Sequence, residues 1–167
     1  MDITSLILDD HHEQRRLFVI LEQIDPGDIA GLTAAWRRLA TFLEVHAESE
    51  ERIFYPALLE VGRATRHDAT EETFDAIKDH NEIRDAVTAA RKAAVGSAAW
   101  FTAVAAANKA NGDHMAEEER EGLTDFRREA SLQLRHDLAV RFISFETTNV
   151  DGVQSVDKDP KAWVAAH

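Results

Sequence analysis

Apolar residues recur at helical spacing from the first residues of the chain. The first stripe passes through Ile3, Ile7, Phe18 and Leu21, and the turn residues 25–28 (DPGD) follow it. Apolar positions that recur every three or four residues are typical of one buried helix face. The pattern predicts a helix over 5–24, with Thr4 as its candidate N-cap.

Three further long segments repeat this spacing, and they predict helices over 32–59, 71–94 and 97–126. Gly62 is expected to end the second helix, and residues 63–70 are expected to form a loop. Pro56 lies inside the second helix, where it should kink or loosen the last turn. A shorter helix is predicted over 131–147, followed by an irregular tail that docks through Trp163.

Four long helices joined by short breaks predict an all-α, up-down-up-down four-helix bundle. We expect the bundle to span 1–130, with the C-terminal helix and tail, 131–167, packed on it. The composition also favours helices, because the 167 residues include only 3 Pro and 7 Gly, the two residues that disfavour helix most.

Charge and cysteine content narrow the possible partners. A formal net charge of −12 disfavours nucleic acid and anionic membrane surfaces. The chain has no cysteine, so any metal must be held by nitrogen and oxygen atoms. The N-terminus shows no signal-peptide pattern and no stretch approaches a membrane span, which predicts a cytoplasmic protein.

Two of the predicted helices carry the same chemical motif, a histidine followed after three residues by a pair of glutamates. The motif reads HAESEE from His46 and HMAEEE from His114. Residues four apart lie on one helix face, so His46 shares a face with Glu50 and His114 with Glu118. A nitrogen and a carboxylate at that separation can approach one ion or two adjacent ions.

The other two helices each offer an inward histidine. His80 lies at helical spacing from Ile77, Ile83 and Val87. His11 has the same relation to Ile7 and Phe18, and its neighbour His12 is the alternative.

The four histidines and two glutamates predicted to point inward are more ligands than a tetrahedral zinc ion takes. They also include too many nitrogen ligands for magnesium or calcium. The set suits two adjacent transition ions with bridging carboxylates, and iron is the natural choice, with manganese and zinc as alternatives. The candidate metal ligands are His11, His46, Glu50, His80, His114 and Glu118.

Other polar residues near the motif are not among the candidate metal ligands. Glu51 and Glu119 are expected to lie behind the ligands or in solvent, with Glu119 as the alternative to Glu118. Tyr55 would approach the metals only if its helix is distorted, and ideal helical geometry favours a packing role. The remaining histidines are expected in a loop, on an outer face and at the terminus: His67, His136 and His167.

The motif-bearing segments resemble the hemerythrin-like, or HHE, cation-binding family. They are DHHEQRRLF, HAESEERIFYPAL, DAIKDHNEIRDAV and DHMAEEE, one on each predicted helix and in the family's order. The resemblance implies a four-helix bundle, a non-haem di-iron centre with an oxo or hydroxo bridge, and the same six ligands.

The chain departs from the oxygen-carrying hemerythrins in two places. It has Ala76 where they have an additional histidine, and Glu118 precedes Glu119, which occupies the place of their fourth-helix carboxylate. A lost protein ligand favours sensing or reactive chemistry with oxygen, hydrogen peroxide or nitric oxide over simple oxygen carriage. Both binding alone and enzymatic turnover are compatible with this expectation.

Two other functions compete with a reactive di-iron centre. One is an iron- or oxygen-responsive regulatory module, in which 131–167 contacts a protein partner or a second copy of the chain. The other is a metal-free helical protein. A ferritin-like site is disfavoured because no Glu-x-x-His occurs in the chain.

Overall fold

The computed structural model describes residues 1–65 and 69–167, and they form helices without any strand. The helical elements are α1 (Ile3–Gln23), α2 (Ile29–Ser49), the π-helix η1 (Glu50–Phe54), α3 (Tyr55–Thr65), α4 (Thr70–Lys92), α5 (Ala98–Arg120), α6 (Gly122–Glu129), α7 (Leu132–Thr148) and α8 (Pro160–Ala166). The predicted all-α class is confirmed. In the described part of the chain, no helix combines the length and apolar character that crossing a bilayer requires.

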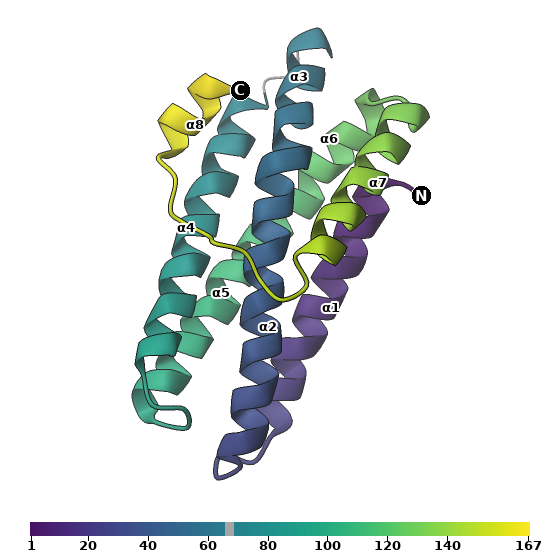
Figure 1. Ribbon diagram of the computed structural model, residues 1–167. Coiled ribbons are helices and arrows are strands. Elements are labelled where there is room, and N and C mark those ends of the chain that lie inside the picture. The colour runs from purple at the N-terminus through teal and green to yellow at the C-terminus, as the bar shows by residue number, and fades with distance from the viewer. Residues whose placement is uncertain (66–68) are drawn as a thin grey trace.

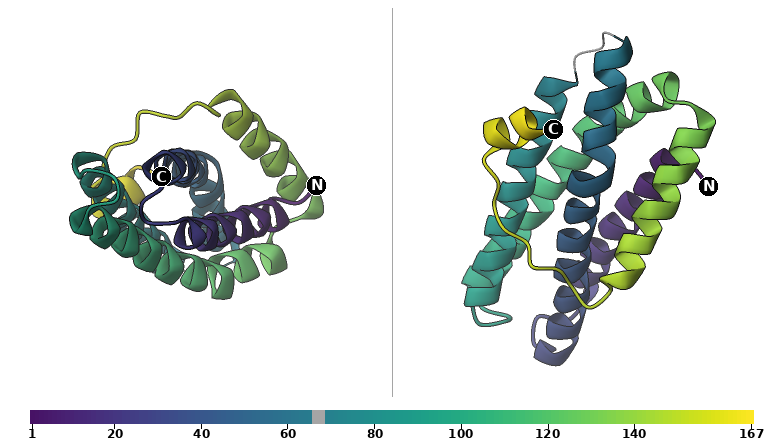
Figure 2. Two further views of the ribbon diagram at one scale, coloured as in Figure 1. Left: turned by 90° about the horizontal axis from the view of Figure 1, so that it is seen from below. Right: turned by 45° about the horizontal axis from the view of Figure 1, so that its top comes forward.

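The main helices alternate in direction along the bundle (Figure 1). α1 runs down in this view, α2, η1 and α3 run back up, α4 runs down and α5 runs up. α7 returns along α1 and α2, and the tail crosses α2 to place α8 against α4, as the views of Figure 2 also show. The four-helix arrangement is therefore as predicted, and the C-terminal residues cover two of its faces.

Apolar side chains form two clusters, one toward each end of the bundle. One cluster includes Ile3, Phe54 and Phe126, and the other includes Leu39, Trp36 and Trp100. Buried polar and charged residues are also present in the interior, among them the six candidate ligands. Since burying polar groups is costly unless they are paired, these side chains need partners of their own.

Several predicted boundaries are wrong. Asp2, rather than Thr4, caps α1, because its carboxylate accepts a hydrogen bond from the Thr4 backbone N–H at 3.0 Å. The second helix does not end at Gly62 but continues to Thr65. The fourth is interrupted at Glu121, whose backbone angles (φ −112°, ψ −81°) are not helical. His67, expected in a loop, lies outside the described residues.

The tail is more ordered than predicted. Asp159 caps α8, accepting a hydrogen bond from the Ala162 backbone N–H at 2.7 Å, and Pro160 occupies the first turn, where its missing N–H costs nothing. Trp163 docks as expected, with its ring centroid 6.5 Å from that of Tyr55.

Candidate metal centre

The six candidate ligands converge in the middle of the bundle. α1 contributes His11, α2 and η1 contribute His46 and Glu50, α4 contributes His80, and α5 contributes His114 and Glu118. None of these residues is more than 6% exposed. Helical spacing accounts for this convergence, because each residue lies on the inward face of its helix.

Glu50 lies between two pairs of histidines. Its Oε1 is 2.9 Å from Nε2 of His46 and 3.8 Å from Nε2 of His11. Its Oε2 is 3.2 Å from Nε2 of His80 and 3.9 Å from Nε2 of His114. One carboxylate thus presents a separate oxygen to each pair, which is the arrangement of a ligand that bridges two ions.

Glu118 completes the set from the fourth main helix. Its Oε2 lies 3.3 Å from Nε2 of His11. Both oxygens of Glu118 are buried and, among the described residues, neither has a hydrogen-bond partner. The same holds for both Glu50 oxygens and for Nε2 of His11 and His46.

These unpartnered atoms test whether metal ions fit the centre. A buried polar atom left unsatisfied costs about 1–3 kcal/mol, and several occur together here. Nε2 of His80 and Nε2 of His114 face each other at 3.1 Å, an arrangement in which both nitrogens cannot donate. Ligand atoms of His11, His46 and Glu50, and of Glu50, His80 and His114, form two groups within 4.8 Å. Cations that accept these lone pairs would satisfy both groups, so the residues present fit a pair of metal ions.

Carboxylates lie behind the histidines, on the side of the Nδ1 atoms. A carboxylate oxygen of Glu119 lies 2.9 Å from Nδ1 of His11, and one of Glu51 lies 2.8 Å from Nδ1 of His80. Nδ1 of His46 is 3.3 Å from Asp10 and 3.7 Å from Glu146. Nδ1 of His114 is 3.8 Å from Asp79. A carboxylate that accepts the Nδ1–H leaves the Nε2 lone pair free to face inward and fixes the ring. Hydrogen bonds to Nδ1 fix His11 through Glu119 and His80 through Glu51, with Nε2 of each ring directed toward Glu50.

The pKa values show that the centre attracts positive charge. Burial lowers the pKa of His11, but the adjacent carboxylates of Glu118, Glu119 and Glu50 outweigh burial and raise the pKa to about 10. Burial raises the pKa of Glu50, but the charge of His46 and the nearby imidazoles of His11 and His114 outweigh burial, and the pKa of Glu50 lies well below its usual value. Without metal, protons therefore occupy positions that a cation would take.

The alternative residues that the sequence left open occupy different positions in the structure. His11 points inward, whereas His12 is exposed. Glu118 faces Nε2 of His11, whereas Glu119 accepts hydrogen bonds from Nδ1 of His11 and from Arg15 at 2.8 Å. Glu51 likewise lies behind His80, as expected for a residue that supports a ligand.

Tyr55 is not the simple packing residue that ideal helix geometry predicts. η1 inserts a wider turn before it, in which the Tyr55 backbone N–H donates to the Glu50 carbonyl oxygen. Its hydroxyl is buried, has no hydrogen-bond partner among the described residues, and shares a cavity with His114 and Glu118. Burial, followed by the charges of Glu118 and Glu50, raises the pKa of Tyr55 well above its usual value, so the phenol stays neutral.

Sequence reasoning missed the contribution of the C-terminal residues. Glu146 on α7 lies beside His46, and Lys158 in the tail pairs with Glu51 and, at 2.9 Å, with Glu48. Asn81 holds the tail through two hydrogen bonds with the Lys158 backbone, at 2.8 and 3.0 Å. No local spacing in the sequence indicates these contacts, because they join residues far apart in the chain.

Comparison with known proteins agrees with this geometry. The model of the hemerythrin HHE cation binding domain matches residues 2–123, which contain all six candidate ligands. No curated protein and no solved structure gives a significant match. The family match covers most of the chain, and the chain belongs to the hemerythrin HHE cation-binding family.

Proposed function

We propose that this chain is a non-haem di-iron protein that binds or reacts with oxygen, hydrogen peroxide or nitric oxide in sensing or stress defence. The observation that carries the proposal is the position of Glu50, with one oxygen toward His11 and His46 and the other toward His80 and His114. Imidazole and carboxylate ligands suit iron, with manganese and zinc as the alternatives.

In this proposal the six candidate ligands would hold two iron ions, and an oxo or hydroxo bridge would complete the centre. Bound iron would supply the one-electron chemistry and the position at which the small molecule binds. The four histidines contribute Nε2 atoms, and Glu50 and Glu118 contribute oxygens. The carboxylates that raise the pKa of His11 favour a proton on its ring, and a proton on Nε2 would have to leave before that nitrogen could hold a metal ion.

The surrounding residues control access to the centre. The apolar clusters on either side restrict water, which strengthens electrostatic interactions between the ligands and an ion. Ala76 leaves room where a larger side chain would close the cavity beside His114, Glu118 and Tyr55. The phenol of Tyr55, held neutral, can donate its proton toward a molecule in that cavity.

Iron analysis tests the proposal directly. Protein reconstituted with Fe²⁺ and exposed to air should contain two irons per chain and show near-ultraviolet absorption from oxo-bridged iron. The double variant His46→Ala, His114→Ala removes one histidine from each pair and should bind less than a tenth of the wild-type iron, since loss of supporting partners alone costs about 10–100-fold in affinity.

Reactivity is the second part of the test. Reduced, iron-loaded protein should change its spectrum on addition of oxygen, hydrogen peroxide or nitric oxide. His136→Ala, an exposed histidine, is the matched control and should behave as wild type. A fully loaded protein that is inert to all three oxidants would contradict the reactive part of the proposal while leaving the metal site in place.

The regulatory alternative gains support from Lys158. Its Nζ pairs with Glu51, which accepts the Nδ1–H of His80 at 2.8 Å, so a tail residue is joined to a candidate ligand through one carboxylate. A tail that only contacted a partner protein would leave the iron spectrum unchanged when removed. The contacts lead us to expect the opposite.

Lys158→Met should therefore shift the reduction potential of the iron-loaded protein to more negative values, because Glu51 then loses the charge of Lys158 and keeps that of Arg84, which leaves the His80 side more negative. Lys158→Arg should restore the wild-type potential, since it keeps the charge. Lys161→Met, an exposed lysine of α8, removes the same charge away from Glu51 and is the control. Equal potentials in all four proteins would disprove the coupling between tail and centre.

A further inference from the structure

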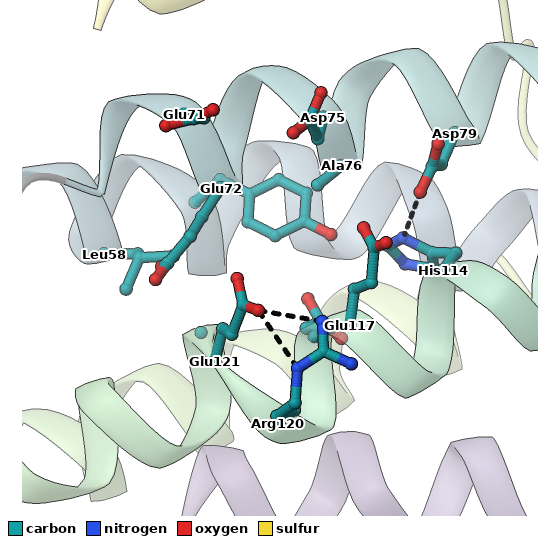
Figure 3. A pocket seen from close by; sticks show the side chains of 13 residues that line it. Leu58, Glu71, Glu72, Asp75, Ala76, Asp79, His114, Glu117, Arg120 and Glu121 are labelled. Atoms are coloured by element: carbon teal, nitrogen blue, oxygen red, sulfur yellow. Dashed lines mark hydrogen bonds and ion pairs between the residues drawn. The ribbon is translucent and has the colours of Figure 1, made fainter.

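A cavity of about 360 Å³ opens beside the candidate ligands, between α3, α4, α5 and the start of α6. Figure 3 shows side chains of α4 and α5 on opposite sides of it, with His114 at one end. His114, Glu118 and Tyr55, each buried, form its inner wall. The cavity therefore joins the surface to the His114 side of the centre.

The walls of this cavity are strongly acidic. The carboxylates that line it are Glu71, Glu72, Asp75, Asp79, Glu117, Glu118 and Glu121. Among the described residues that line it, the only cation is Arg120, and it pairs with Glu121 at 2.8 Å (Figure 3). The potential along the cavity is consequently negative.

A second observation indicates that the cavity receives a ligand. The Tyr55 hydroxyl and both Glu118 oxygens line it, are buried, and have no hydrogen-bond partner in the part of the chain that the structure describes. Tyr55 is 1% exposed and Glu118 is 6% exposed, so bulk water does not satisfy them. Polar atoms of this kind, at the inner end of an acidic passage, fit an arriving cation or a small hydrogen-bonding molecule.

We propose that this cavity is a charge-selective mouth, through which divalent metal ions load the centre and from which anionic ligands are repelled. The proposal rests on the proposed metal site and adds its route of access and its substrate class. Neutral molecules such as hydrogen peroxide, oxygen and nitric oxide pass, whereas anions such as superoxide and azide are disfavoured. Ala76 keeps the passage open, because its small side chain lies in the wall between Asp75 and Asp79.

The electrostatic argument sets the size of the expected effect. Clefts lined by one sign of charge raise association rates of oppositely charged ligands by about 10–1,000-fold, and salt weakens the effect. The Debye length falls from roughly 30 Å at 0.01 M to roughly 8 Å at 0.15 M ionic strength, so the effect should be largest in dilute buffer.

Metal loading measures this effect without requiring catalysis. We would mix metal-free protein with Co²⁺ in a stopped-flow instrument and follow the visible absorption of bound Co²⁺. The variant Glu71→Gln, Asp75→Asn, Glu117→Gln neutralises three wall residues that are not candidate ligands. Its association rate constant should fall by about tenfold at low ionic strength, and the difference should shrink as salt is added.

A second triple variant controls for net charge. Glu22→Gln, Asp85→Asn, Asp151→Asn removes the same charge from exposed positions that do not line the cavity. It should load at the wild-type rate, and all three proteins should bind the same amount of Co²⁺ at equilibrium. The Co²⁺ association rate constant of the wild type should itself fall as salt is added, and this measurement needs no variant.

Azide provides the complementary probe. It should bind the metal-loaded wild type slowly and the cavity variant about tenfold faster, since the repulsion is then reduced. Equal Co²⁺ loading rates in the wild type and the cavity variant, or an equal loss in the control, would overturn the charge-selective mouth. A wild type that takes up no Co²⁺, Fe²⁺ or Mn²⁺ would instead overturn the metal site itself, and the mouth with it.

Discussion

Replacing Glu50 with alanine should weaken metal binding at both positions at once, by more than about 100-fold. Loss of residues that merely support metal ligands costs about 10–100-fold in affinity, and Glu50 is placed to contact both ions. Its two oxygens face different histidine pairs, so neither pair keeps a carboxylate from this residue. Iron content after dialysis, measured by elemental analysis, checks the prediction.

Glu44→Gln is the matched control for this variant. Glu44 lies on α2, which leads directly into η1, but its carboxylate pairs with Arg91 at 2.5 and 2.6 Å, away from the histidines. It should retain wild-type iron content. A Glu50→Ala protein that keeps one tightly bound iron would show that a single histidine pair suffices and that Glu50 is no bridge.

The metal-free protein should lose stability as the pH rises from about 6.5 to about 10. His11 has its pKa raised from 6.5 to about 10 in the folded chain, with burial opposing and the adjacent carboxylates of Glu118, Glu119 and Glu50 producing the rise. A group whose pKa is higher when folded stabilises the fold below its unfolded pKa, and this stabilisation is lost as pH approaches the folded pKa. The titration of His11 should lower the free energy of unfolding by about 1.4 kcal/mol per pH unit within this window.

Urea unfolding of chelator-treated protein at several pH values measures this slope. His11→Gln should flatten the profile, because it removes one of the titrating groups, whereas the exposed His136→Gln should leave it unchanged. The pKa values of His46 and His80 are also raised, with burial again opposing and nearby carboxylates producing the rise, so some slope persists in His11→Gln. A profile that is flat in the wild type between pH 6.5 and 9.5, given the pKa of about 10, would contradict the prediction.

The metal-loaded protein should show the opposite dependence. Metal ligation needs imidazoles without a proton on Nε2, so acid favours the protonated, metal-free form. Metal loss is expected as the pH falls from about 7 to 5, around the unperturbed histidine pKa near 6.5. The two stability profiles should therefore differ in sign, which separates a metal protein from a metal-free helical bundle.

Periodicity in the sequence determined the helical class, the number of main helices and their inward faces. A helix turns by a constant angle per residue, so spacing alone places His46 with Glu50 and His114 with Glu118 on single faces. The hydrophobic stripe then shows which faces are buried. These are local properties of the chain, and the family match over residues 2–123 covers both motifs.

Only the tertiary structure decided what surrounds those side chains. The wider turn of η1 breaks the constant rotation per residue, so the direction of Tyr55 did not follow from spacing. Glu146 and Lys158 reach the centre from α7 and the tail, and their contacts depend on how those segments cross the bundle. The acidic cavity likewise joins residues of α3, α4 and α5, and its charge becomes concentrated only when the helices pack. Sequence patterns describe one helix at a time, whereas the environment of a buried centre is set by contacts between helices.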